Sequence, residues 1–258
     1  MNNIKKKIFF IASSYSTVDI FLKNLILDLE INGYEIFIVT NFNSVNKPLK
    51  KLSNIHYINL NIQRKIRIFN DFISIIKLFK IIYKYKPSLS ISITPKGGFY
   101  NSIVSFFLKN NSLHFFTGQI WINKKDLGRF FFKNIDKFVY NNITHLFADS
   151  KSQINFLIAQ GFIKKKINLI NNGSICGVDT NLFSNDKYPK NKKIYQRHND
   201  RLLIGYIGRL NYEKGILNLI NCFSMLIKNN YKVSLILVGN DENNIINLIN
   251  NKFIDISK

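Results

Sequence analysis

Residues 203–215 read LIGYIGRLNYEKG, a short apolar run followed by a glycine-containing loop with one arginine and one lysine. An apolar run that ends at a glycine is typical of a buried parallel strand, and apolar residues return at helical spacing after Gly215. The stretch therefore predicts a strand, a loop and a helix. Arg209 and Lys214 flank the helix start, where unpaired backbone N–H groups favour a phosphate or diphosphate. The alternative is a solvated loop in which the charge of Glu213 offsets that of Lys214. The residues of this loop, taken alone, favour the solvated loop over a phosphate site.

The rest of the chain alternates short apolar runs with helical patterns, which predicts Rossmann-like α/β domains. The predicted strands lie at residues 4–12, 35–40, 55–60, 89–93, 113–116, 145–150, 167–170, 201–208 and 232–238. The predicted helices lie at residues 18–29, 66–85, 103–108, 127–140, 153–160, 217–227 and 242–249. We expect a Rossmann-like N-terminal domain over residues 1–172, a connection over 173–200 and a partial second domain over 201–258.

The charge balance points to an anionic partner. The chain carries 37 Lys and Arg against 15 Asp and Glu, a formal net charge of +22. Such a surplus favours nucleic acid, an anionic membrane surface or phosphorylated substrates. A nucleic-acid-binding module is not favoured, because the basic residues are spread along the chain and no helix-turn-helix, RNA-binding signature or zinc knuckle occurs.

Several other site types lack their signatures in this sequence. Cys176 and Cys222 stand far apart without paired histidines, which argues against a zinc site and against a disulfide framework. No Asp-x-Asp occurs, so a metal-bridged diphosphate is not indicated, and we expect no metal and no cofactor. No G-x-G-x-x-G follows the first strand, which weakens a dehydrogenase interpretation. No apolar run approaches the roughly 18 residues of a membrane span.

Two helical patterns are amphipathic, and each allows two interpretations. The pattern over residues 66–85 combines an apolar face with several lysines and arginines, and the pattern over 127–140 contains Phe130, Phe131 and Phe132. Such helices can lie on an anionic membrane. They can also be ordinary α/β helices whose apolar faces pack on a sheet, and this second interpretation is favoured for both.

Two motifs resemble those of a known enzyme family. Residues 208–215 resemble the "G-R-L-x-x-x-K-G" loop of retaining family 4 glycosyltransferases. Residues 172–183, NGSICGVDTNLF, are similar to the "N-G-(S-x-x)-G-V-D-x-x-x-F" segment that joins the two domains of these enzymes. The resemblance implies the GT-B fold, in which two Rossmann-like domains face each other across a cleft. It also implies that Arg209 and Lys214 neutralise the leaving diphosphate of a nucleotide-sugar donor.

Further cleft positions are expected at Lys96, Gly118 and Gly173. Lys96 follows a predicted strand and precedes two glycines, much like a "t-p-K-g" segment of the family, although a tight βα turn is the alternative. Many related transferases carry a histidine where this chain has Thr117. His114 lies at the other end of that strand, and we expect it to be a packing residue.

The resemblance implies a retaining, metal-independent transferase that moves a hexose or N-acetylhexosamine from a nucleotide-sugar to a lipid-linked or polysaccharide acceptor. We expect it to act in cell-surface polysaccharide synthesis (lipopolysaccharide or capsule), as a cytoplasmic protein peripheral to the inner face of the cytoplasmic membrane. The family's glutamate pair, spaced by seven residues, does not occur after Lys214. The alternative is therefore an inactive truncated remnant, or one half of a split transferase that needs a partner chain.

Overall fold

The computed structural model describes residues 5–42, 54–63, 65–184, 186–187, 196 and 198–253. The chain forms two compact units, Met1–Val178 and Asp179–Lys258. The boundary between them falls inside the connection expected over residues 173–200, although residues 185, 188–195 and 197 of that connection lie outside the described residues.

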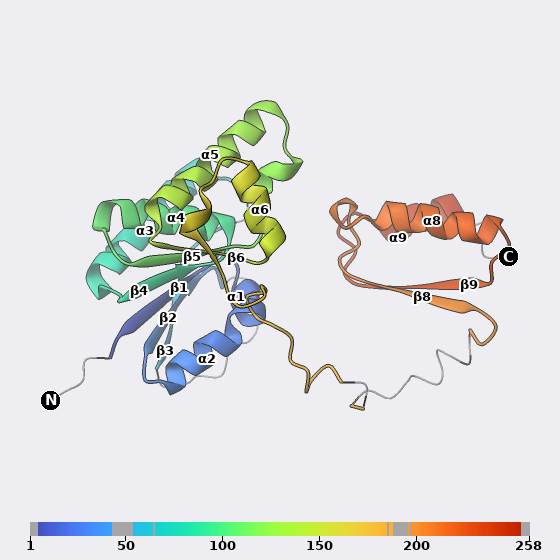
Figure 1. The fold of residues 1–258 in the computed structure, drawn as a ribbon, viewed down its shortest axis with the longest axis horizontal. Helices are drawn as coiled ribbons and strands as arrows, with labels where there is room; N and C mark the ends of the chain where they lie inside the picture. Colours follow the sequence, from blue (N-terminus) through green and yellow to red (C-terminus); the bar gives the residue numbers. More distant parts are fainter. Residues whose placement is uncertain are drawn as a thin grey trace. The chain divides into compact units, whose positions relative to one another are not determined.

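The first unit is built on a seven-stranded parallel sheet with the order β3-β2-β1-β4-β5-β6-β7 (Figure 1). Its strands are β1 (Lys7–Ile11), β2 (Glu35–Thr40), β3 (Ile55–Asn59), β4 (Leu89–Ser92), β5 (Ser112–Phe116), β6 (His145–Ala148) and β7 (Ile167–Leu169). Ile8 of β1 pairs with Ile36 on one side and with Leu89 on the other. The strand order therefore reverses between β1 and β4, and ligands of open parallel sheets bind where the strand order reverses, at the carboxyl ends of the strands.

Helices cover both faces of this sheet. They are α1 (Tyr15–Phe21), α2 (Lys23–Ile31), α3 (Ile68–Tyr85), α4 (Pro95–Leu108), α5 (Asp126–Asn142) and α6 (Lys151–Ala159), with 3-10 turns η1 (Ile120–Asn123) and η2 (Lys164–Lys166). In Figure 1, α3, α4 and α5 lie over one face, while α1 and α2 lie over the other. Successive residues of β1 alternate accordingly: Phe10 packs with the α1 and α2 side chains, and Phe9 with those of α3 and α4. Burial on both faces explains the continuous apolar runs.

The second unit contains a parallel pair of strands, β8 (Leu202–Ile207) and β9 (Val233–Val238), with Leu202 opposite Val233. The turn η3 (Tyr212–Lys214) and the helix α8 (Ile216–Lys228) follow β8, and α9 (Ile245–Phe253) follows β9. A small core joins these elements around Leu210, Ile216, Ile220 and Ile245. The strand, loop and helix predicted from residues 203–215 are thus confirmed.

Three helices differ from the prediction, and one of them is α9, which was expected at 242–249 and runs from Ile245 to Phe253. The helix expected at residues 18–29 is divided at Leu22 into α1 and α2. The helix expected at 103–108 begins at Pro95, where the Thr94 side chain caps it by accepting a hydrogen bond from the Gly97 N–H at 3.2 Å. Gly97 therefore lies inside the helix rather than in a loop. A Cβ atom at Gly97 would stand 2.9 Å from the Ile11 carbonyl oxygen, so glycine is needed where α4 packs directly on the sheet.

Within the described part of the chain, no helix combines the length and apolar character that a membrane crossing requires.

Candidate functional site

The loop that opens the second unit is shaped by one asparagine and one glycine. The Asn211 side chain accepts a hydrogen bond from the Lys214 backbone N–H at 3.1 Å and so caps the turn η3. Gly215 takes the left-handed conformation, with φ 71°, and α8 begins at the next residue. The chain therefore turns sharply between β8 and α8, and both Arg209 and Lys214 stand in the short segment before the helix.

A close approach between two strand ends holds the start of this loop. Gly239 follows β9 with φ 151°, and a Cβ atom there would stand 1.8 Å from the Gly208 carbonyl oxygen. No side chain fits between these two backbones. The contact brings the segment after β9 against the segment after β8.

Arg209 is held by a carboxylate that the sequence analysis did not single out. Its Nη1 atom donates to both oxygens of Glu242, at 3.1 and 3.0 Å, and the Asn211 amide donates to Glu242 Oε2 at 2.9 Å. Arg209 remains 45% exposed, and the two bonds leave from one nitrogen of a group with five N–H donors. Lys214 is exposed and forms no ion pair within the described residues. The loop thus presents one oriented and one unpaired cation before α8.

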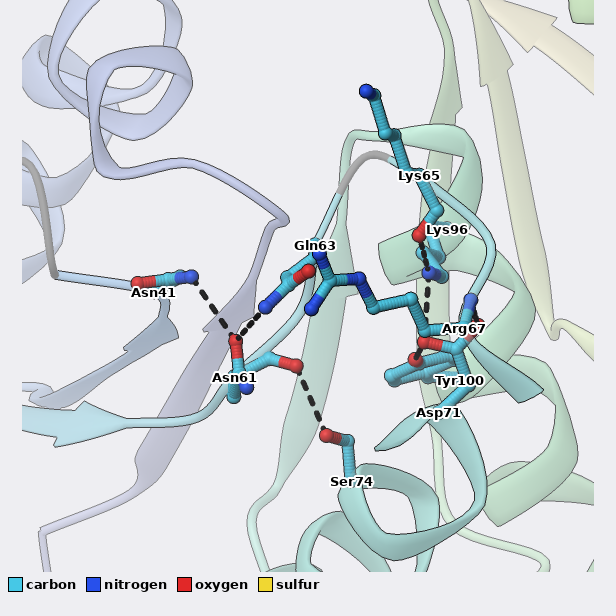
Figure 2. Close-up of polar contacts among 9 residues, drawn as sticks. All are labelled: Asn41, Asn61, Gln63, Lys65, Arg67, Asp71, Ser74, Lys96 and Tyr100. Carbon is cyan, nitrogen blue, oxygen red and sulfur yellow. Dashed lines mark hydrogen bonds and ion pairs between the residues drawn. The ribbon is translucent and has the colours of Figure 1, made fainter. Parts of the chain in front are cut away.

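Lys96 lies in the first turn of α4, where it is paired with Asp71 of α3 (Figure 2). The Lys96 ammonium stands 2.7 Å from Asp71 Oδ1 and donates to the Lys65 carbonyl oxygen at 2.7 Å. Tyr100 also donates to Asp71 Oδ1, at 2.8 Å. Burial alone would raise the pKa of Asp71, but the bonds from Lys96 and Tyr100 overcome it and lower that pKa. Lys96 is therefore a neutralised group in the wall of a cavity, not a solvated cation.

A second polar group lies at the same edge of the sheet. Asn61 Oδ1 accepts from the Gln63 amide at 3.1 Å and from the Asn41 amide at 3.3 Å, and the Asn61 carbonyl oxygen accepts from the Ser74 hydroxyl at 3.0 Å (Figure 2). Asn41 follows β2 directly, and Asn61 follows β3. The cluster therefore marks the carboxyl ends of these strands with amide groups.

Gly118 and Gly173 follow the ends of other strands of the same sheet. Gly118, after β5, has φ 143°. Gly173, after β7, has φ 105°, and a Cβ atom there would stand 2.4 Å from the Asp149 carbonyl oxygen. Like Lys96 after β4, both lie at the carboxyl edge. The backbone conformation of each glycine position favours glycine. Lys96 lies in the wall of one cavity and Gly118 in the wall of a second, smaller one.

His114 is a packing residue, as predicted. It is 3% exposed, and its Nδ1 lies 3.0 Å from the Ser92 hydroxyl. Burial lowers the pKa of His114 to about 3, so the ring is neutral. A Cβ atom at Gly98 would stand 2.4 Å from the ring, which shows how closely α4 covers it.

The sequence analysis missed a cavity of about 330 Å³ between α3, α4, α5 and η1. Trp121 and Asp136 lie in its wall, and the indole N–H donates to Asp136 Oδ2 at 2.7 Å. Burial raises the pKa of Asp136 to about 6, and the indole hydrogen bond partly opposes this rise. A lone carboxylate inside the aromatic helical pattern of residues 130–138 was the signal available for this site. Among the described residues, no cluster of His, Cys, Asp and Glu could hold a metal ion.

The fold defined by this arrangement is the GT-B fold. Anabaena HepE, in complex with UDP and glucose, is 16% identical with a TM-score of 0.69, covering 98% of this chain and 66% of that one. Sucrose-phosphate synthase from Thermosynechococcus elongatus is 16% identical with a TM-score of 0.69, covering 98% of this chain and 68% of that one. A putative UDP-N-acetylglucosamine 2-epimerase from Listeria monocytogenes is also similar, at 14% identity and a TM-score of 0.63, covering 96% and 66%. At these identities the similarity shows the fold alone.

Sequence comparison is more specific. Residues 187–256, which include Arg209 and Lys214, match the family Glycosyl transferases group 1. The capsular polysaccharide biosynthesis glycosyltransferase CapM of Staphylococcus aureus is 29% identical over 202 residues, covering 77% of this chain and 53% of CapM. An uncharacterized glycosyltransferase of Methanocaldococcus jannaschii is 26% identical over 180 residues, covering 65% and 44%. The chain spans about half the length of these curated relatives. The predicted resemblance to GT-B glycosyltransferases is confirmed.

Proposed function

We propose that the chain is part of a glycosyltransferase that moves a sugar from a nucleotide-sugar to an acceptor in cell-surface polysaccharide synthesis. The observation that carries the proposal is the segment between β8 and α8, which lies inside the family match and presents Arg209 and Lys214 at a helix start. Similar folds bind UDP in HepE and in S. aureus MnaA, and CapM is named for capsular polysaccharide synthesis. The donor, by this reasoning, is a nucleoside diphosphate sugar.

The proposed chemistry depends on neutralising the leaving group. As the bond between the anomeric carbon and the diphosphate breaks, the electron pair goes to the diphosphate oxygen. The oxygen of an acceptor hydroxyl forms the new glycosidic bond, and its proton passes to the leaving diphosphate. The first N–H groups of α8 and the cations of Arg209 and Lys214 stabilise the charge that develops there. This cation pair would perform the role that a metal has elsewhere, so we propose a metal-independent transfer. The resemblance to retaining family 4 glycosyltransferases is the ground on which we propose retention of the anomeric configuration.

The acceptor side is proposed to be the first unit, working at an anionic membrane surface. Its helices leave large apolar side chains in solvent, including Phe69 at 75%, Leu127 at 84% and Phe130 at 70% exposure. A net charge of +22 favours binding to anionic lipid headgroups. We therefore propose a lipid-linked or glycan acceptor, a hexose or N-acetylhexosamine as the sugar, and a peripheral position at the inner face of the cytoplasmic membrane.

Nucleotide binding by the full chain tests the donor site. We expect UDP-glucose or UDP-N-acetylglucosamine to bind in titration calorimetry, and Arg209→Ala or Lys214→Ala to weaken binding by roughly tenfold or more, since a charged hydrogen bond contributes about 1.5–3 kcal/mol. The matched control is Lys228→Ala, which removes an exposed lysine from the other end of α8. Equal affinities in all three variants would contradict the donor-site assignment.

The alternative, in which the chain needs a partner chain, is tested by a different measurement, the transfer of sugar. The resemblance to the family motivates it, because the family's glutamate pair does not occur among residues 215–258. A chain of this kind would bind the nucleotide-sugar but transfer no sugar alone, and a second chain that supplies the carboxylates would restore turnover. Sugar transfer by the chain alone would exclude this alternative.

A further inference from the structure

The cavity of the first unit is formed by three helices and a 3-10 turn. Its wall comes from the N-terminal halves of α3 and α4, from the middle of α5 and from η1, and it has a volume of about 330 Å³. The apolar wall residues include Ile68, Phe72, Ile103, Ile120, Phe131 and Ile135. Helices α3, α4 and α5 follow β3, β4 and β5, so the cavity lies at the carboxyl edge of the sheet. This is the edge where open parallel sheets bind ligands, and the volume is within the roughly 300–1,000 Å³ of ligand pockets.

The polar groups of the wall are engaged with one another. Asp71 accepts from Lys96 and Tyr100, as Figure 2 shows, and Asp136 accepts from Trp121. A sugar or a nucleotide placed here would lose water from many hydroxyl groups and find few partners, which is unfavourable. An apolar chain has no hydroxyl groups whose hydration it would lose. The cavity therefore selects for a hydrocarbon.

The apolar surface continues outward from the cavity. Ile68 is 83% exposed, Phe72 61% and Phe131 56%, although all three belong to the wall. Soluble proteins rarely expose contiguous large apolar side chains unless a partner covers them. An elongated ligand that leaves the cavity along these side chains would cover them.

Exposed basic residues occur in the same two chain segments as this apolar surface and indicate the other end of the ligand. The segments 65–72 and 120–132 carry five basic residues, against Asp71 and Asp126 as their acids, and Asp71 is already paired with Lys96. The five are Lys65, Arg67, Lys124, Lys125 and Arg129, all exposed. The charge thus complements an anionic head group on an apolar chain.

We propose that this cavity holds the hydrocarbon chain of a lipid phosphate, the carrier part of a lipid-linked acceptor, with the phosphate bound by basic residues of segments 65–72 and 120–132. The inference rests on the proposed transferase function and names the substrate class of the acceptor. A chain seated between α3, α4 and α5 would fix the position of the head group at the carboxyl edge of the sheet.

The test uses the full chain and farnesyl phosphate below its micelle concentration, with inorganic phosphate and farnesol as separate probes. We expect farnesyl phosphate to bind more tightly than either fragment. Ile103→Trp, which fills the cavity and removes no charge, should weaken its binding at least tenfold. Ile163→Trp adds the same ring at a position that is 67% exposed and outside the cavity, and it should leave the affinity unchanged. Equal binding by the wild type and Ile103→Trp would overturn the proposal.

Photo-crosslinking provides a measurement that needs no variant. A farnesyl phosphate analogue with a diazirine on its chain should label peptides that contain residues 66–75, 95–103 or 131–136. Labelling confined to other segments would overturn the proposal.

Ile103→Trp should still bind anionic vesicles as the wild type does, and a parallel loss of vesicle binding would show membrane docking in place of a chain site. Titration of the same samples with a nucleotide-sugar separates the lipid-site hypothesis from the donor-site hypothesis. A wild-type chain that binds farnesyl phosphate but no nucleotide-sugar would contradict only the donor site.

Discussion

The buried carboxyl of Asp136 predicts how the stability of the fold changes with pH. Burial raises the pKa of this carboxyl from 3.8 to about 6, against the hydrogen bond from Trp121. An acid with a raised pKa in the folded state contributes stability that is full below about pH 3.8 and is lost as the pH rises through 6. The difference between the two values corresponds to about 3 kcal/mol, because one pH unit corresponds to about 1.36 kcal/mol. Asp136→Asn removes the charge and should therefore gain about 2.5 kcal/mol relative to the wild type between pH 4 and pH 7.

Urea unfolding followed by fluorescence measures this effect, since Trp121 is the single tryptophan and lies against Asp136. The readout is the difference between variant and wild type, because His114, with its pKa lowered to about 3, loses stability in acid in both proteins. Asp126→Asn, which removes an exposed carboxylate from the same helix, is the matched control and should run parallel to the wild type. A difference that stays constant from pH 4 to pH 7 for Asp136→Asn would refute the reasoning.

Two further predictions concern the backbone of the second unit and the ion pair of the first. Gly239→Ala would bring a Cβ to 1.8 Å from the Gly208 carbonyl oxygen and should destabilise the second unit by roughly 2–5 kcal/mol in urea unfolding followed by circular dichroism. Gly205→Ala, whose Cβ meets nothing within 4 Å, should change stability by less than about 1 kcal/mol, and equal effects of the two would contradict the close approach. Lys96→Met should destabilise the first unit by about 1–3 kcal/mol at pH 7, because Asp71 loses its cation. The pKa of Asp71 is lowered, so its stabilisation is present above about pH 3.8 and is lost in more acidic solution; a penalty that persists unchanged below that pH would speak against the ion pair.

The order of strands and helices was largely predictable, because burial on both faces of a parallel sheet leaves unmistakable apolar runs. The run at residues 35–40 became β2 with the same bounds. The start of α4 was missed because Gly97 and Gly98 are typical of loops by composition. Inside the structure these glycines allow α4 to approach Ile11 and His114 closely, and that contact is between segments far apart in the sequence.

The site was less predictable than the fold, because its contacts also join segments that are far apart in the sequence. Arg209 and Lys214 were found from local spacing, but the pairing of Arg209 with Glu242 joins two loops that only the parallel pair β8 and β9 brings together. The cavity could not be read from any one pattern. Each of its helices looked like an ordinary amphipathic helix with its apolar face on the sheet. That prediction is confirmed for Ile82 and wrong for Phe72 and Phe131, which remain exposed around a shared space.

The position of β1 in the sheet has a consequence for synthesis. Among the strands of this sheet β1 is made first, yet it lies between β2 and β4, and Ile8 pairs on its second side only after Leu89 has been made. During that interval the nascent chain presents an open edge of apolar residues, the kind of edge that joins wrongly with other chains. Slow translation between β3 and β4 would therefore lower the yield of folded protein.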